Sequence, residues 1–268
     1  MVPPIDPVLF SLGPFTVHWY GVLVVTGIML GAQVAAYLAK RAGEDPERVW
    51  DMLMVAVITG IIGARIEYVT VSPHWTYYSQ HIADAFKIWE GGLRIYGAVV
   101  GGALGVLGYA MVTKTRPWPL LDFAAPGMAM GHAIGRWGNF INTELYGPPT
   151  TKPWGLLIPL PYRVPPYNDI GLYPPDTLFH ANFLYESIAN LLLCLVLVWV
   201  ADRFRGRLKE GTLIAGYLIG YSIIRFFMDY WRTDNTSAQV PALIFAALGI
   251  VFLIVRYQPW RPSQRAGA

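Results

Sequence analysis

Five arginine residues lie inside long apolar stretches of the sequence or at their ends: Arg65, Arg94, Arg136, Arg225 and Arg232. A guanidinium group is permanently charged and can bind two phosphate oxygens at once. Because a charge inside a membrane is costly, such residues usually face the protein interior and are either paired or functional. We interpret this cluster as a site for an anionic group. Structural ion pairing is the alternative, which we favour for Arg232, and the acidic residues available for it are Glu67, Glu90, Glu144, Glu186 and Asp229.

Helical spacing would bring several of these groups onto common faces. His132 and Arg136 are four residues apart, so a helix would place them on one face. Spacings of four, four and three put another polar set on one stripe of a helix: Tyr221, Arg225, Asp229 and Arg232. The spacing therefore predicts two helices that line a polar, basic cavity.

The elements that position these groups are predicted to be membrane helices. Hydrophobic residues make up 54% of the 268 residues and charged residues only 14%, whereas soluble domains are about a quarter charged. A membrane-spanning helix needs about 20 mostly apolar residues. We predict an all-α integral membrane protein of about seven transmembrane helices, with residues 1–268 forming a single polytopic membrane domain. The predicted spans are 19–39, 49–71, 94–112, 119–138, 181–201, 211–230 and 239–257.

The distribution of Lys and Arg predicts the orientation of the chain. Twelve of the 20 basic residues lie in the turns after the first, third and fifth spans and in the C-terminal tail. Basic residues accumulate in cytoplasmic segments, so we expect the N-terminus outside and the C-terminus in the cytoplasm. The irregular segment 139–180, which holds nine of the 21 prolines, is then an extracytoplasmic head segment.

Several classes of function are disfavoured. The net charge of +3 is small and its basic residues are dispersed, so no nucleic-acid binding is expected. The single cysteine, Cys194, lies in an apolar run, and we expect it to be packed rather than catalytic. The N-terminus has no basic segment followed by a cleavage site, so it does not resemble a cleaved signal peptide. No nucleotide-binding or metal-binding motif appears, so no cofactor is expected.

One motif identifies a family resemblance. Residues 135–147 read Gly-Arg-Trp-Gly-Asn-Phe-Ile-Asn-Thr-Glu-Leu-Tyr-Gly and resemble the signature G-R-x-G-N-F-x-N-x-E-x-x-G of prolipoprotein diacylglyceryl transferases. Further matching pieces follow in the family's order: His18–Gly21, Gly63–Ile66, Trp89–Gly92, Leu184–Glu186 and Ile219–Arg225. The resemblance extends from about residue 5 to 257, and it implies seven spans with the N-terminus outside.

The sequence departs from the family pattern at two places. Some members have a histidine, implicated in catalysis, where this chain has Tyr96, so a histidine base at that position is excluded. The family segment H-P-x-Q-L-Y-E is His180-Ala-Asn-Phe-Leu-Tyr-Glu186 here. Because its Pro and Gln are absent, substrate contacts through that Gln cannot be transferred to this chain.

The resemblance implies a lipid-transfer reaction in the bacterial cytoplasmic (inner) membrane. Family members join the thiol of a lipobox cysteine, in the signal peptide of a prolipoprotein, to the diacylglyceryl group of phosphatidylglycerol. Glycerol phosphate is released. The implied phosphatidylglycerol-binding residues are Arg136, Arg225, Asn139, Glu144, Gly147 and Tyr221. Arg136 and Arg225 would also stabilise the leaving phosphate, and the candidate proton acceptors or orienting groups are Tyr20, Tyr96 and His180.

Simpler roles and other functions are open at this point. Asn139 could cap a helix, Glu144 could pair an arginine, Gly147 could serve a tight turn, and Tyr20 could belong to an aromatic belt. A transporter or flippase could use the buried arginines as an anion pathway, although we find no internal repeat of the kind common in transporters. A non-catalytic scaffold would leave the basic cluster unexplained.

Overall fold

The computed structural model describes residues 1–3, 6–13, 15–71, 73–233 and 239–258. The chain forms two compact units: Met1–Leu38 with Leu121–Ala268, and Ala39–Leu120. The expectation of a single membrane domain stays a prediction, and each unit is described by itself.

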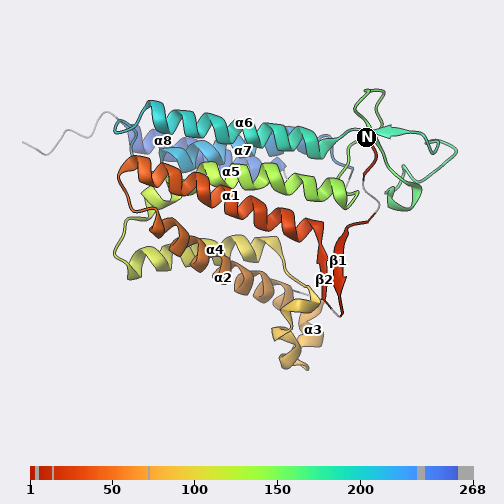
Figure 1. Ribbon diagram of the computed structural model, residues 1–268, viewed down its shortest axis with the longest axis horizontal. Coiled ribbons are helices and arrows are strands. Elements are labelled where there is room, and N and C mark those ends of the chain that lie inside the picture. Colours follow the sequence, from red (N-terminus) through yellow and green to blue (C-terminus); the bar gives the residue numbers. More distant parts are fainter. Residues whose placement is uncertain (4–5, 14, 72, 234–238, 259–268) are drawn as a thin grey trace, which may run out of the picture. The chain divides into compact units, whose positions relative to one another are not determined.

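The first unit is built mainly from five long helices (Figure 1). These are α1 (Trp19–Ala42) and α5 (Pro117–Ile141), whose far ends extend beyond the unit, with α6 (Asn182–Arg203), α7 (Thr212–Asp229) and α8 (Gln239–Tyr257). Helix α7 packs against both α6 and α8. An antiparallel hairpin of β1 (Val8–Leu12) and β2 (Phe15–His18) precedes α1.

Small residues let α1 and α5 approach closely. A Cβ atom added at Gly31 would clash with the carbonyl oxygen of Gly127, and one added at Gly127 would clash with that of Gly31. Ala125 and Ala129 on α5 are fully buried, and they belong to a core cluster with Cys194. Close backbone approach of this kind is typical of helices packed within a membrane.

The head segment contains β3 (Leu156–Leu157), the 3-10 turn η3 (Leu160–Tyr162) and β4 (Leu178–Phe179), which pairs with β3. Arg163, only 5% exposed, holds this segment together. Its guanidinium donates to the carbonyl oxygens of Ile158 (2.9 Å), Tyr173 (2.9 Å), Pro174 (3.0 Å) and Pro175 (2.7 Å). Prolines cannot donate backbone hydrogen bonds, so a side chain with five donors supplies the order that a helix would otherwise supply.

The second unit consists of α2 (Glu47–Thr70) and α4 (Ile95–Val112), which pack along their length, with the short helices α3 (His74–Tyr78), η1 (Ile82–Phe86) and η2 (Ile88–Glu90) between them. A Cβ atom at Gly63 would clash with the carbonyl oxygen of Gly97, so these glycines set the helix separation. The buried Arg65 donates to four carbonyl oxygens of the connecting loop: Asp84 (2.8 Å), Ala85 (2.7 Å), Gly91 (2.7 Å) and Gly92 (3.2 Å).

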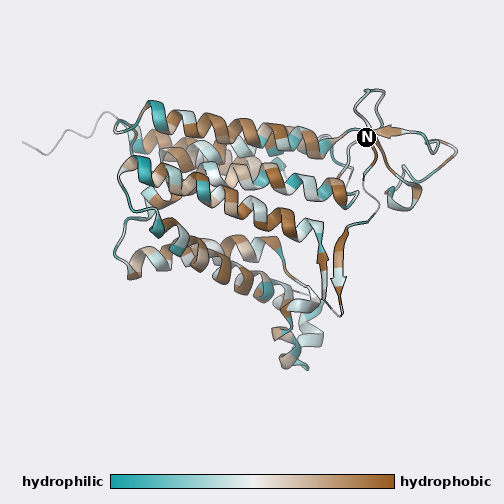
Figure 2. Cartoon of the chain, viewed as in Figure 1, coloured by the Kyte–Doolittle hydropathy of each residue, from teal (hydrophilic) through white to brown (hydrophobic). Residues whose placement is uncertain are grey.

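The chain is an all-α multi-pass membrane protein, as predicted. Six of the described helices are long and apolar enough to cross a membrane: α1, α2, α4, α6, α7 and α8. Hydrophobic residues run along most of their lengths, and hydrophilic residues gather at the turns between them (Figure 2). The predicted span 119–138 forms the 25-residue helix α5 but is not among the six; it carries Asp122, His132 and Arg136. Its place as a seventh span stays a prediction.

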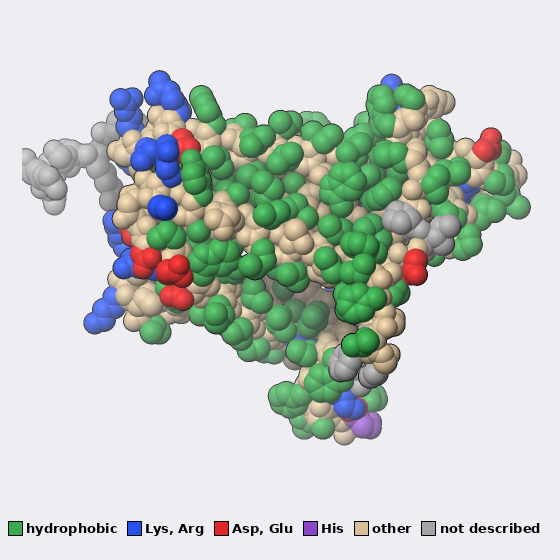
Figure 3. Space-filling model, viewed as in Figure 1, with side chains coloured by type: hydrophobic (Ala, Val, Ile, Leu, Met, Phe, Trp, Pro, Cys, Tyr) green, Lys and Arg blue, Asp and Glu red, His purple; other side chains and the backbone are tan. Residues whose placement is uncertain are grey.

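Asp122 joins α5 to the start of α7. Asp122 is only 8% exposed. Its carboxylate accepts hydrogen bonds from the backbone N–H groups of Gly211 (2.6 Å) and Ile214 (2.9 Å). A negative charge is stabilised at the N-terminus of a helix, where N–H groups lack intrahelical partners. Basic side chains gather at the same end of this unit, around the turn that follows α6 (Figure 3).

Candidate active site

The site begins at the C-terminal end of α5, where the chain turns back on itself. Thr143 (φ 57°) and Leu145 (φ 55°) both adopt the left-handed conformation, which is uncommon outside glycine and is unfavourable for a β-branched residue. The turn brings Glu144 back to Asn139: the Asn139 side-chain amide donates to Glu144 Oε1 at 2.8 Å, and the Glu144 N–H donates to the Asn139 carbonyl at 3.0 Å. Strain of this kind persists at functional sites when the surroundings hold it.

Two arginines from different helices share one carboxylate oxygen. Arg136 Nη2 on α5 lies 2.8 Å from Glu186 Oε2 on α6, and Arg225 Nη1 on α7 lies 3.5 Å from the same oxygen. The Glu186 side chain is 2% exposed, and the arginine side chains are 15% and 14% exposed. Asp229 Oδ1 lies 4.0 Å from Arg225 Nη2. The predicted pair of arginines is therefore brought together, around an acid that the sequence had offered only as one possible partner.

Arg136 links this group to the strained turn. Its Nη1 donates to Asn139 Oδ1 at 3.2 Å, and Asn139 in turn donates to Glu144. Arg225 Nη1 is buried and has no hydrogen-bond acceptor within the described part of the chain. Glu186 Oε2, at 3.5 Å, forms an ion pair but no hydrogen bond with this nitrogen, so Arg225 Nη1 can still donate to an incoming anionic oxygen.

The motif glycines are sites of close contact. A Cβ atom at Gly138 would lie 2.5 Å from Cδ2 of Tyr20, so the glycine lets that ring lie against α5, one residue before Asn139. A Cβ atom at Gly147 would lie 2.6 Å from Asn182 Oδ1 and 2.7 Å from the Cβ atom of His180. The glycines thus bring two candidate residues from α1 and the head segment toward the motif.

His180 lies in an aromatic cluster at the start of α6. Its Nδ1 is 3.1 Å from the hydroxyl of Tyr185, which also accepts a hydrogen bond from Trp154 Nε1 at 2.8 Å, and its ring packs on Trp231 with centroids 4.5 Å apart. Burial lowers the pKa of His180, and the positive charge of Lys152 lowers this pKa further. The imidazole is thereby favoured in its neutral form, the form that can accept a proton.

A second polar group lies one helical turn from the two arginines, toward the middle of α5 and α7. His132 Nε2 is 3.0 Å from the hydroxyl of Tyr217, and the His132 ring stacks on Tyr221 with centroids 4.5 Å apart. Tyr221, which was predicted to bind the lipid head group, lies one helical turn before Arg225 on α7. Stacking on His132 fixes the position of its ring. The sequence indicated the shared face of His132 and Arg136 but not this partnership across helices.

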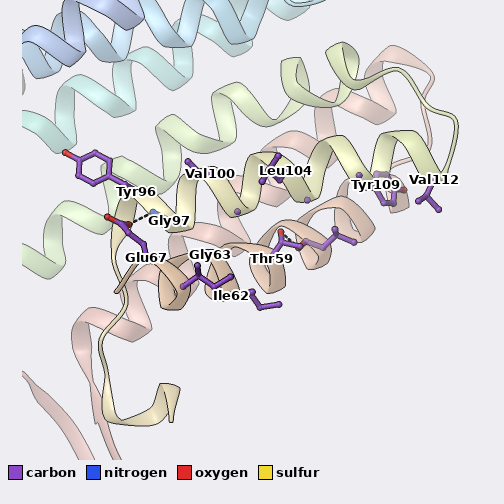
Figure 4. A pocket seen from close by; sticks show the side chains of 15 residues that line it. Thr59, Ile62, Gly63, Glu67, Tyr96, Gly97, Val100, Leu104, Tyr109 and Val112 are labelled. Atoms are coloured by element: carbon purple, nitrogen blue, oxygen red, sulfur yellow. Dashed lines mark hydrogen bonds between the residues drawn. The ribbon is translucent and has the colours of Figure 1, made fainter. Parts of the chain in front are cut away.

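Tyr96 belongs to the second unit, where it lies at one end of an apolar groove between α2 and α4 (Figure 4). The groove has a volume of about 970 Å³, and Tyr96 is 70% exposed. Glu67 accepts a hydrogen bond from the N–H of Gly97 and pairs with Arg94 Nε at 3.3 Å, so it fixes the first turn of α4. Arg65 and Arg94 are thus engaged by groups within their own unit.

Residues outside the predicted set complete the first unit's site. Glu186, Asn182 and Trp231 contact the predicted residues directly. A glutamate within an otherwise apolar span was the available signal for Glu186, because such a residue needs a partner. Within the described ranges, no group of three or more His, Cys, Asp or Glu side chains could hold a metal ion.

Comparisons with known proteins identify the family of this chain. A family model described as prolipoprotein diacylglyceryl transferase matches residues 7–255. A relative from Chloroflexus aggregans, named phosphatidylglycerol–prolipoprotein diacylglyceryl transferase, is 41% identical over 89% of this chain and 81% of its own. Relatives with the same name from Nostoc sp. (40% identical, 96% of this chain and 91% of the relative) and Staphylococcus epidermidis (36%, 95% and 91%) are similar. The chain belongs to the prolipoprotein diacylglyceryl transferase family and is a transferase.

Proposed function

We propose that this protein transfers the diacylglyceryl group of phosphatidylglycerol to the lipobox cysteine of prolipoproteins. The observation that carries the proposal is the convergence of Arg136 and Arg225 on one oxygen of Glu186, next to a motif turn held in a strained conformation. Two guanidinium groups that both lie within ion-pair distance of one carboxylate oxygen can also bind the oxygens of one phosphodiester.

The reaction requires charge to be stabilised on the leaving group. The cysteine sulfur attacks the glycerol carbon, the carbon–oxygen bond breaks with its electron pair moving to the phosphate oxygen, and the thiol proton is released. Arg136 and Arg225 bind the phosphate and gain strength as its charge grows. Their field also favours the thiolate form of the incoming cysteine.

The remaining residues orient the substrates. Asn139 holds Arg136 in place, Glu144 fixes Asn139, and Gly147 allows the head segment to pack against the start of α6. Tyr221 lies beneath the arginines, where its ring can contact the lipid head group. Tyr20, Tyr96 and His180 are the candidates for proton acceptor, and the neutral form of His180 favours it for that role.

The proposed location is the bacterial cytoplasmic membrane, with the N-terminus outside and the C-terminus in the cytoplasm. The twelve basic residues in the turns after α1, α4 and α6 and in the tail support this orientation. The site would then lie near the outer leaflet, where the signal peptide of an exported prolipoprotein presents its cysteine.

The test is direct detection of the product. Purified protein in vesicles of phosphatidylglycerol is incubated with a lipobox peptide, and mass spectrometry should find the peptide with thioether-linked diacylglycerol and an equal amount of glycerol phosphate. A peptide with serine in place of the cysteine is the control and should stay unmodified. Movement of lipid or anions across the vesicle without any thioether would refute the proposal in favour of a transporter.

A further inference from the structure

We propose that Glu186 acts as a built-in counter-anion, which makes the site hold a singly charged phosphodiester but release a doubly charged phosphomonoester. The inference rests on the proposed function, because it concerns the same arginines. Phosphate binding by Arg136 and Arg225 does not by itself explain product release. Glycerol phosphate is more negative than the phosphodiester substrate, so two arginines alone would bind the product more tightly than the substrate.

The geometry gives Glu186 this position. Its Oε2 lies 2.8 Å from Arg136 Nη2 and 3.5 Å from Arg225 Nη1, so one oxygen faces both guanidinium groups. The carboxylate is 2% exposed, so water screens it little. Asn190, one helical turn along α6 and fully buried, donates its side-chain amide to the backbone carbonyl of Glu186 at 2.8 Å, so a second buried polar residue lies beside Glu186.

The charges explain the selectivity. Arg136 and Arg225 bring two positive charges, and Glu186 places one negative charge within ion-pair distance of both of them. During the reaction the phosphodiester, with one negative charge, becomes glycerol phosphate, which carries two above a second pKa of about 6. An anion fixed beside the arginines opposes the dianion about twice as strongly as the monoanion, because Coulomb energy scales with the product of the charges.

A carboxylate that only positioned the arginines would have a different signature. Removing it would let the two guanidinium groups move apart, and every anion would bind more weakly. Removing a counter-anion makes every anion bind more tightly, and the dianion most. The direction of the change therefore separates the two roles.

The experiment measures binding to full-length purified protein in a neutral detergent at pH 8 by calorimetry. The probes are glycerol phosphate, a dianion, and glycerophosphoglycerol, a monoanionic diester. Glu186→Gln should lower the Kd of the diester roughly tenfold and that of glycerol phosphate roughly a hundredfold, the square of the first factor. The same variant should show stronger product inhibition and a burst of one turnover before a slower steady state. Glu186→Asp keeps the charge and should stay close to wild type in the ratio of the two Kd values.

The matched control removes another buried carboxylate from the same unit. Asp122→Asn changes the charge by the same amount, but Asp122 lies 14 residues from Arg136 on α5, about 21 Å at the helical rise, so both Kd values should stay unchanged. Unchanged or weaker binding of glycerol phosphate to Glu186→Gln would overturn the proposal.

A measurement on the wild-type protein does not depend on how the variants fold. The native site should bind the diester at least as tightly as glycerol phosphate at pH 8, and a tenfold preference for glycerol phosphate would overturn the inference. If that preference appears while thioether product still forms, only the inference fails. If the wild type binds neither anion and makes no thioether, the proposed function fails as well.

Discussion

Replacement of Arg136 by lysine tests whether planar, multiple hydrogen bonding matters beyond charge. Arg136 uses Nη2 for Glu186 at 2.8 Å and Nη1 for Asn139 at 3.2 Å, so its two terminal nitrogens serve two partners at once. A lysine side chain offers a single nitrogen, which cannot occupy both places and also meet a phosphate oxygen. Loss of one charge-stabilising donor typically costs about 2–4 kcal/mol of transition-state stabilisation, or roughly 30-fold to 1,000-fold in rate.

The assay is kcat/KM for thioether formation in phosphatidylglycerol vesicles, measured at equal amounts of folded protein. Arg136→Lys should fall by that factor, mainly in kcat, because the contact strengthens as the leaving phosphate gains charge. Arg207→Lys, an exposed replacement in the turn after α6, is the matched control and should keep the wild-type value. If Arg136→Lys stays within threefold of wild type, charge alone suffices and the proposed geometry of the clamp is wrong.

The other predictions use labelling, substitution and pH. In a variant whose Cys194 is replaced by alanine, a cysteine introduced at Ser79 or Thr150 should react with an impermeant maleimide on intact, wall-stripped cells. A cysteine introduced at Lys209 should not react, and the opposite labelling pattern would reverse the predicted orientation. Cys194→Ala should itself leave transfer close to wild type, since the thiol is 1% exposed in an apolar core cluster, and a lipid adduct trapped on Cys194 would contradict this. Because burial lowers the pKa of His180 in the folded protein, its contribution to stability is complete above about 6.5 and is lost as the pH falls further. The protection of amide hydrogens in the head segment, which is the exchange rate relative to the intrinsic rate at the same pH, should therefore decrease between pH 7 and 5. A His180→Asn variant that kept the same pH dependence of protection would refute that assignment.

The helices could be predicted from the sequence more completely than the site. Apolar runs of about 20 residues gave each long helix to within three residues at either end, because helix length in a membrane follows the thickness of the bilayer. The spacing predicted that Tyr221 and Arg225 share one face of α7, and in the structure these two residues contact His132 and Glu186. Pairing across helices was not predictable in the same way: nothing in the spacing says that Arg136 and Arg225 meet at Glu186 rather than at Glu144 or Asp229.

The roles of the individual arginines could be assigned only from the structure. Arg65 and Arg163 are arginines like Arg136, yet each donates its hydrogen bonds to backbone carbonyl oxygens of a nearby irregular segment. Irregular backbone leaves carbonyl groups without partners, and which side chain satisfies them depends on the path of the loop. The fold of the proline-rich head segment around Arg163 could not be read from composition alone.

The polar character of α5 has a consequence for how the protein is made. An arginine or aspartate at the centre of a membrane helix raises the free energy of insertion by about 2.5–3.5 kcal/mol. Helix α5 carries both Asp122 and Arg136, each nearer to one of its ends, where the cost per residue is smaller. Their partners, the Gly211 and Ile214 amides and the Glu186 carboxylate, are synthesised only afterwards, with α6 and α7. Helix α5 should therefore wait beside the insertion machinery until those helices emerge, and enter the bilayer together with them. In a ribosome-bound chain that ends shortly after residue 180, a cysteine placed in α5 should still react with a water-soluble maleimide, whereas in one that extends past α7 it should be protected. Early protection of α5 in the shorter chain would contradict this order of assembly.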